Sequence, residues 1–223
     1  MLASLRQPLS DRLHQGCARL GAPVANLSEA QRNALLDYVD LLAHWNSRFN
    51  LTAVRDPLDM IGHHLLDSLA AVDAFVASPV LDLGTGAGLP GIPLAIARPE
   101  LQFVLLDSIG KKTRFVRQAA ASLELANVTV IQARFESYQP AEKFATITAR
   151  ALAPLAALWS GSAHLRQPGA ALLAYKGRRP DDEIATLRPP AGATGEGPSV
   201  TRVSVTRLEV PFVPGERHLI RID

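Results

Sequence analysis

The sequence predicts an α/β fold in which a helical N-terminal extension precedes a mostly parallel, seven-stranded sheet. Three observations support this prediction. Apolar residues recur at helical spacing through residues 1–77, apolar runs alternate with helical segments from residue 79 onward, and a glycine-rich turn joins the first apolar run to a helix start. We expect the extension, 1–77, and the sheet domain, 78–223, to pack together as one structural unit.

The extension is expected to contain three helices. Leucines at helical spacing between residues 2 and 20 indicate the first helix. The second begins at a capping box made of Ser28 and Gln31, in which each side chain satisfies a backbone N–H near the helix start. The third begins at Asp56 and Pro57 and is predicted to run to about Phe75.

From residue 79 onward, strands and helices alternate, which favours parallel pairing. We expect strands near 80–83, 102–106, 127–132, 144–149 and 170–175, followed by an antiparallel pair at 200–210 and 217–222. Helices are expected near 90–97, 110–124 and 152–166, with a short one after Pro180. Residues 188–198 are rich in turn formers and are predicted to form a loop.

Composition narrows the class of protein. The chain has 223 residues, of which 48% are hydrophobic and 20% charged, as in soluble globular proteins. Its net charge of +2 permits an RNA partner without requiring one. Cys17 is the only cysteine, so no disulfide can form within the chain, and a reducing cytosol fits. Polar residues interrupt every apolar stretch, so we expect no signal peptide and no membrane span.

The glycine turn after the first strand is the strongest signal of a ligand site. Gly84, Gly86 and Gly88 remove side chains where the backbone must turn and approach a ligand closely. A dinucleotide-binding turn would carry a third glycine at position 89, but this chain has Leu89. The G-x-G-x-G spacing after Asp82 is instead similar to motif I of the S-adenosylmethionine-dependent methyltransferases.

An acidic residue at the end of the second strand supports this interpretation. Asp107 stands where such folds place the carboxylate that binds the ribose hydroxyls of the cofactor. The simpler alternative is that Asp82 and Asp107 only cap the helices that follow them. Together, the turn and Asp107 predict a Rossmann-like, class I S-adenosylmethionine-dependent methyltransferase fold.

Two methyl-transfer chemistries do not fit. Amino methylation in the familiar families uses an Asn/Asp-Pro-Pro-aromatic tetrapeptide after the fourth strand, where this chain has Thr-Ala-Arg-Ala at 148–151. Methylation at cytosine C5 needs a cysteine nucleophile in the catalytic domain, and Cys17 lies far upstream in the extension.

Several further motifs resemble the RsmG (GidB) family, the bacterial 16S ribosomal RNA guanine-N7 methyltransferases. The resemblance covers residues 30–222. Its motifs are DLGTGAGLPGIPL at 82–94, LDSIGKK at 106–112, WNSRFNLTAVRDP at 45–57, HLLDSL at 64–69, ARA at 149–151, KG at 176–177 and GERHL at 215–219.

This resemblance implies transfer of a methyl group from S-adenosylmethionine to N7 of the guanine at position 527 of 16S ribosomal RNA, within the small ribosomal subunit. It also implies a set of cofactor-binding residues: Gly84, Gly86, Leu89, Asp107, Phe135, Glu136 and Arg150. Guanine N7 carries an in-plane lone pair and no proton, so the reaction needs alignment of donor and acceptor rather than a general base. No catalytic residue is therefore assigned.

Cations near these motifs are candidates for binding RNA phosphate. They are Arg55, Lys111, Arg114, Lys176, Arg178 and Arg179. His64 is a further RNA candidate because, with Asp67, it can buttress the cofactor or RNA pocket. For the lysines and arginines the simpler alternative is a solvated surface, for His64 a structural hydrogen bond, and for Arg150 a salt bridge.

No metal site is expected, because His63, His64 and Asp67 lack a further ligand at recognisable spacing. We expect a cytoplasmic monomer. Two other functions remain open at this point. The same fold could methylate a small molecule or a protein, or the chain could be a non-catalytic ribosome-assembly factor that retains the cofactor fold.

Overall fold

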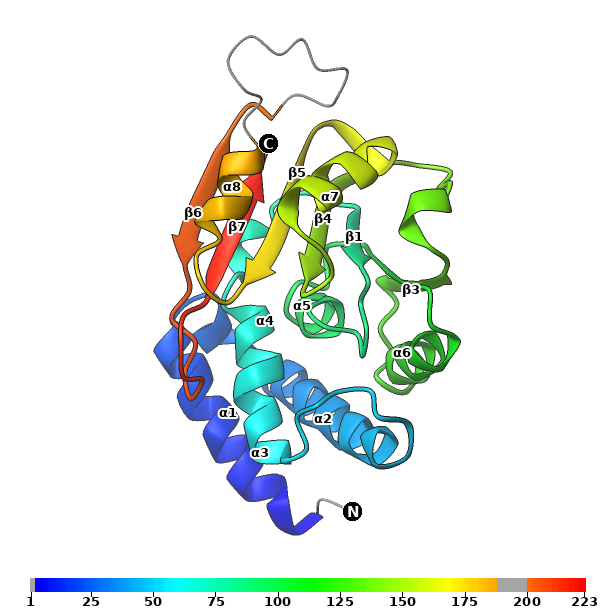
Figure 1. The fold of residues 1–223 in the computed structure, drawn as a ribbon. Helices are drawn as coiled ribbons and strands as arrows, with labels where there is room; N and C mark the ends of the chain where they lie inside the picture. Colours follow the sequence, from blue (N-terminus) through cyan, green and yellow to red (C-terminus); the bar gives the residue numbers. More distant parts are fainter. Residues whose placement is uncertain (1–2, 188–199) are drawn as a thin grey trace, which may run out of the picture.

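The computed structural model describes residues 3–187 and 200–223, so the start of the first predicted helix and the predicted loop at 188–198 lie outside the described residues. Seven strands form one sheet in the order β3-β2-β1-β4-β5-β7-β6 (Figure 1). The strands are β1 (Val80–Leu83), β2 (Phe103–Asp107), β3 (Val128–Gln132), β4 (Phe144–Arg150), β5 (Arg166–Lys176), β6 (Val203–Arg207) and β7 (His218–Ile222).

The first five strands pair in parallel, whereas β7 lies antiparallel to both β5 and β6. This confirms the predicted, mostly parallel seven-stranded sheet. The order reverses between β1 and β4, which are adjacent in the sheet although β2 and β3 come between them in the chain. In such sheets, ligands bind at the carboxyl ends of the strands next to this reversal.

Helices cover both faces of the sheet (Figure 1). The N-terminal extension contributes η1 (Ala3–Leu5), α1 (Arg6–Leu20), η2 (Val24–Asn26), α2 (Glu29–Phe49), α3 (Pro57–Met60), the π-helical segment η3 (Ile61–Leu66), α4 (Asp67–Leu69) and η4 (Val72–Ala74). The remaining helices are α5 (Gly91–Ala97), α6 (Gly110–Ser122), η5 (Phe135–Ser137), α7 (Leu155–Gly161), η6 (Ala163–Leu165) and α8 (Asp181–Leu187).

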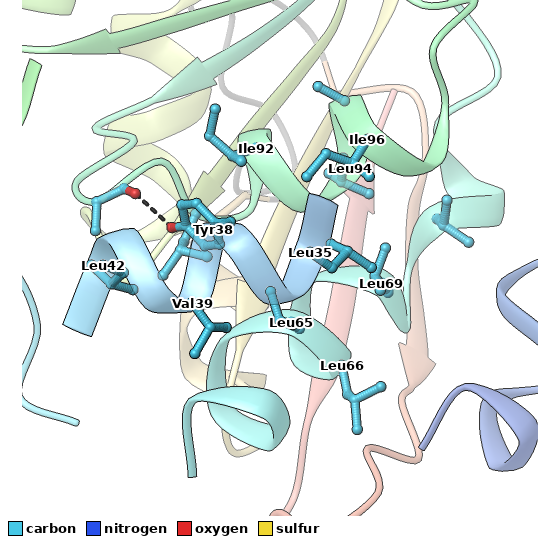
Figure 2. Close-up of a cluster of buried hydrophobic side chains, with 14 of the residues drawn as sticks. Leu35, Tyr38, Val39, Leu42, Leu65, Leu66, Leu69, Ile92, Leu94 and Ile96 are labelled. Carbon is cyan, nitrogen blue, oxygen red and sulfur yellow. Dashed lines mark hydrogen bonds between the residues drawn. The ribbon is translucent and has the colours of Figure 1, made fainter. Parts of the chain in front are cut away.

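The extension shares a hydrophobic core with one face of the sheet. Figure 2 shows α2 between the π-helical segment and α5, with Leu35 and Val39 near Leu65 and with Ile92 beyond them. Each of these four side chains has essentially no exposed surface. A second core on the opposite face packs α7 and α8 against the sheet. The extension therefore covers the sheet face that also carries α5 and α6.

Local signals explain where most helices begin. The Ser28 hydroxyl accepts a hydrogen bond from the Gln31 backbone N–H, and the Gln31 side-chain oxygen accepts one from the Ser28 backbone N–H, which confirms the predicted capping box at the start of α2. Asp56 caps α3 through a hydrogen bond from the Leu58 N–H, and Pro57 is its first residue.

Several predicted boundaries were wrong. The predicted third helix does not continue to Phe75, because regular helix ends at Leu69. The predicted helix at 152–166 is shorter, because it begins only at Leu155 and breaks into η6 after Gly161. The fifth strand starts earlier than expected, at Arg166, and the sixth is confined to 203–207.

Candidate active site

The glycine turn between β1 and α5 has a backbone that only glycine adopts easily. The φ angles of Gly84, Gly86 and Gly88 are 65°, 62° and 90°, all in the left-handed region. A Cβ on Gly84 would lie 2.6 Å from the Leu152 Cδ1 atom, and a Cβ on Gly88 would lie 2.7 Å from the Ile92 Cγ1 atom. The turn is therefore packed tightly on one side, and its three glycines leave the backbone without side chains.

Asp82 stabilises this turn through two hydrogen bonds to its carboxylate. Its Oδ2 atom accepts hydrogen bonds from the Thr85 hydroxyl at 2.6 Å and from the Gly91 N–H at 3.0 Å. Gly91 is the first residue of α5, so Asp82 does cap that helix. The carboxyl group is fully buried, and this burial raises its pKa to about 6, against the opposing effect of the two hydrogen bonds.

Asp107 links the same turn to the start of α6. Its Oδ2 atom accepts a hydrogen bond from the Gly86 N–H at 3.0 Å, and its Oδ1 atom accepts one from the Ile109 N–H at 2.8 Å. The Lys112 Nζ atom lies 3.8 Å from Oδ2. A carboxylate offers about four lone-pair sites, so these bonds leave capacity for a ligand. The capping alternative is thus part of the role of Asp107 and does not exclude ribose binding.

A cavity of about 250 Å³ lies at the carboxyl ends of the central strands, beside the turn. It is lined by Gly84, Leu106, Asp107, Ser108, Ile109, Lys112, Ala133, Arg134, Phe135, Glu136, Ala151 and Leu152. Four of the predicted cofactor-binding residues are among them: Gly84, Asp107, Phe135 and Glu136.

Apolar side chains form part of the cavity wall. Ile109 and Leu152 keep 43% and 39% of their surface exposed although both are large and apolar. Phe135 packs against α7, where a Cβ on Gly161 would lie 2.9 Å from its ring. Sequence reasoning did not single out Ile109 or Leu152. Their position just after the ends of β2 and β4 was the available signal, because ligands of open α/β sheets bind there.

A larger cavity of about 530 Å³ lies between α6 and β3, and it contains none of the predicted cofactor-binding residues. Arg117 and Glu124 are its charged lining residues. The smaller cavity is the better candidate because it adjoins both the glycine turn and the Asp107 carboxylate.

Three predicted cofactor residues, Gly86, Leu89 and Arg150, are not among the residues that line the cavity, although the Gly86 N–H is bonded to Asp107 at its edge. Leu89 is buried within the turn, where its N–H donates a hydrogen bond to the Thr85 carbonyl. Arg150 ends β4, and its Nη1 atom donates to the Asp67 Oδ2 atom at 2.8 Å and to the His63 carbonyl at 3.2 Å. The alternative of a salt bridge for Arg150 is therefore realised, and Arg217 pairs with the other Asp67 oxygen at 3.1 Å.

His64 is enclosed by the extension. It is 5% exposed, and its Nε2 atom lies 2.9 Å from the Thr52 hydroxyl. Burial, together with the nearby charge of Arg150, lowers its pKa to about 4, so the imidazole is neutral at pH 7. A buried neutral ring fits the structural alternative better than contact with an RNA phosphate.

The other RNA candidates differ in how free they are. Arg55, Arg114 and Arg178 are exposed. The Lys111 Nζ atom donates to the Phe49 carbonyl at 3.0 Å but remains exposed. Lys176 instead forms a close ion pair with Glu183 of α8, with N–O distances of 2.9 and 2.8 Å.

The described part of the chain carries neither a metal-binding cluster nor a membrane-spanning helix. No group of three or more His, Cys, Asp or Glu side chains is arranged to hold a metal ion in residues 3–187 and 200–223. No helix in those ranges combines the length and apolar character needed to cross a membrane.

The sheet order, the glycine turn after β1 and the acid at the end of β2 define the class of this protein, the Rossmann-like S-adenosylmethionine-dependent methyltransferases. A solved methyltransferase, the apo form of SibL, shares this fold with a TM-score of 0.56 at 18% identity, over 99% of this chain and 76% of that chain. The family model for rRNA small subunit methyltransferase G matches residues 31–207. The chain belongs to that family, as the sequence motifs predicted.

Curated relatives agree over nearly the full length. The ribosomal RNA small subunit methyltransferase G of Methylococcus capsulatus is 47% identical over 210 residues, which cover 94% of this chain and 96% of the relative. The protein of the same name from a Janthinobacterium species is 47% identical over 228 residues, which cover 100% and 98%. That from Xanthomonas euvesicatoria is 48% identical and covers 90% of each chain.

Proposed function

We propose that this protein transfers a methyl group from S-adenosylmethionine to N7 of the guanine at position 527 of 16S ribosomal RNA. The observation that carries the proposal is the cavity beside the glycine turn, which the Asp107 carboxylate borders. The chain that contains this cavity belongs to the family described above. The names of its relatives specify the RNA of the small ribosomal subunit as their substrate.

The residues around the cavity fit the parts of this cofactor. The backbone at Gly84 and Gly86 would allow close approach of the amino acid portion, and Asp107 would accept hydrogen bonds from the ribose hydroxyls. The apolar walls at Phe135 and Leu152 suit the adenine ring. We assign Glu136 to the adenine edge, and we assign Leu89 and Arg150 to shaping the site without lining the cavity.

The chemistry asks little of the side chains. S-adenosylmethionine supplies an electrophilic methyl group on its sulfonium, and the N7 lone pair of guanine can attack without loss of a proton. The protein contributes by orienting the two partners and by excluding water from the cavity.

Methyl transfer from labelled S-adenosylmethionine tests the proposal. We expect the purified protein to label small ribosomal subunits or their RNA, and nuclease digestion to yield N7-methylguanine. D107A should reduce labelling at least tenfold, whereas D73A, which removes an exposed carboxylate of η4, should not. Label in a protein or a small molecule would instead favour a methyltransferase that acts on that class of substrate. Cofactor binding without any labelled product would favour a non-catalytic assembly factor.

We further propose that the protein acts as a cytoplasmic monomer. Its proposed substrate supports the cytoplasm as its compartment, since ribosomal subunits are assembled there. Light scattering should give a mass near the 23.9 kDa of one chain. A mass near twice this value would contradict the monomer.

A further inference from the structure

Phe49 is a large apolar side chain at the surface, at the end of α2 that contacts the start of α6. It is the last residue of α2, and 40% of its surface is exposed. Its carbonyl oxygen accepts a hydrogen bond from the Nζ atom of Lys111 on α6. The next residue, Lys112, lines the cavity, so the end of α2 contacts the same turn of α6 that borders the cavity.

The Phe49 ring is held in place by a row of aromatic side chains. Its centroid lies 5.2 Å from that of Trp45, which lies 5.6 Å from Phe115, and Phe115 lies 6.2 Å from Tyr38. The Tyr38 hydroxyl donates a hydrogen bond to the Ala87 carbonyl at 2.6 Å, as Figure 2 shows. Ala87 belongs to the glycine turn. The row therefore links the exposed ring to the glycine turn.

Three cations belong to the same part of the chain as Phe49 or contact its backbone. Arg48 precedes it in α2, Lys111 contacts its backbone, and Arg55 is tied to the same turn through a 2.8 Å hydrogen bond to the Asn50 side chain. All three are exposed. The nearby acid, Asp56, instead uses its carboxylate to cap α3.

An exposed aromatic ring among cations matches the chemistry of single-stranded RNA. Unpaired bases stack on aromatic side chains, while lysine and arginine bind the phosphates on either side. A protein partner would be expected to need a broader apolar patch than a single ring supplies. The charge around Phe49 therefore favours a nucleotide as its occupant.

We propose that Phe49 stacks against an unpaired base that flanks the methylated guanine, with Lys111 and Arg55 on the adjacent phosphates. The stacked base would hold the RNA strand in register with the cavity. This inference rests on the proposed function and adds a specific residue that positions the substrate.

Four single variants test the role of the ring. F49A removes the stacking surface, F49L keeps apolar cover over Trp45 without an aromatic face, and F49W restores such a face. V76A is the matched control, because Val76 is 70% exposed and lies outside this surface. Steady-state methyl transfer is measured with purified small-subunit RNA or subunits, and S-adenosylhomocysteine binding is measured separately by calorimetry.

We expect F49A and F49L each to raise the KM for the RNA substrate about tenfold, which is within the range for loss of one stacked base. F49W should restore the KM, V76A should leave it unchanged, and all four should bind S-adenosylhomocysteine normally. A normal KM in F49A would overturn the inference because the ring would then not be needed. A normal KM in F49L would overturn it because apolar cover alone would then suffice. Absence of N7-methylguanine with the unmodified protein would instead overturn the proposed function.

Discussion

At Gly84, both the backbone conformation and the close packing require a glycine. Its φ of 65° and the 2.6 Å approach of Leu152 to an added Cβ mean that any side chain must displace the cavity wall. We predict that G84A weakens S-adenosylhomocysteine binding at least tenfold, measured by calorimetry.

Gly169 supplies the matched control for that substitution. Its φ is 77°, but no atom lies within 4 Å of an added Cβ. G169A should therefore lose about 1 kcal/mol of stability from backbone strain alone, with normal cofactor binding. Equal affinity in the two variants would show that the turn does not border the cofactor.

Asp82 and His64 make opposite contributions to the pH dependence of stability. The pKa of Asp82 rises from 3.8 to about 6 on folding, so the folded chain binds the extra proton and this contribution falls as pH rises between about 4 and 6. The pKa of His64 falls from 6.5 to about 4, so the unfolded chain binds the extra proton and this contribution is lost as pH falls through the same range.

We therefore predict that removing either group leaves the pH dependence of the free energy of unfolding that the other group contributes. Between pH 4.5 and 6, the free energy of unfolding should fall with rising pH in H64Q and rise in D82N, each relative to the unmodified protein. The slopes should not exceed about 1.4 kcal/mol per pH unit. Urea unfolding at several pH values measures them, and three parallel profiles would refute the assignment.

At the residue scale, sequence reasoning identified the groups that follow from strand ends and glycine spacing. Asp107 and Gly84 are of this kind, because position after a parallel strand determines which edge of the sheet a residue reaches. It could not foresee that Arg150 pairs with Asp67. The two residues are 83 positions apart, and only the packing of the extension on the sheet brings them together.

At the element scale, the helix after Pro57 shows why its length was mispredicted. The apolar pattern continues toward residue 75, but residues 61–66 form a π-helical segment, and regular helix ends at Leu69. The segment presents the His63 carbonyl to Arg150 and is followed at once by Asp67, which binds both Arg150 and Arg217. Tertiary contacts thus determine where this helix changes geometry, and the spacing of apolar residues in the sequence does not predict those contacts.

The Lys176–Glu183 pair joins the end of β5 to α8. Glu183 also accepts a 2.7 Å hydrogen bond from the Leu155 N–H at the start of α7. The sequence offered Lys176 as a phosphate ligand, but its ammonium group is engaged by this carboxylate. The neighbouring Arg178 is exposed and is the better candidate for RNA.

We predict different consequences for these two cations. K176A should destabilise the protein by about 1 kcal/mol, because it leaves the partly buried Glu183 carboxylate without its cation. R178A should leave stability unchanged and reduce the salt dependence of RNA binding by about 0.7 in log–log slope, the value for one phosphate of a single strand. Thermal unfolding and binding titrations at several salt concentrations check both, and a reversed pattern would contradict the assignment.

At the scale of the whole molecule, the alternation of strands and helices predicted the sheet, and the family motifs predicted the relatives that were found. The mostly parallel order follows because helical crossovers bury both faces of the sheet. The placement of the extension did not follow from the sequence. Its helices cover the face carrying α5 and α6, which brings the Phe49 backbone into contact with Lys111 at the start of α6.

The position of N7-methylguanine in small-subunit RNA is the measurement that tests the central claim most directly. RNA from cells that lack this chain, and from the same cells supplied with the unmodified protein or with G84A, should be mapped at single-nucleotide resolution. The account predicts that the methyl group at position 527 is absent without the chain, restored by the unmodified protein and strongly reduced with G84A. Full methylation at that guanine in cells lacking the chain would contradict it.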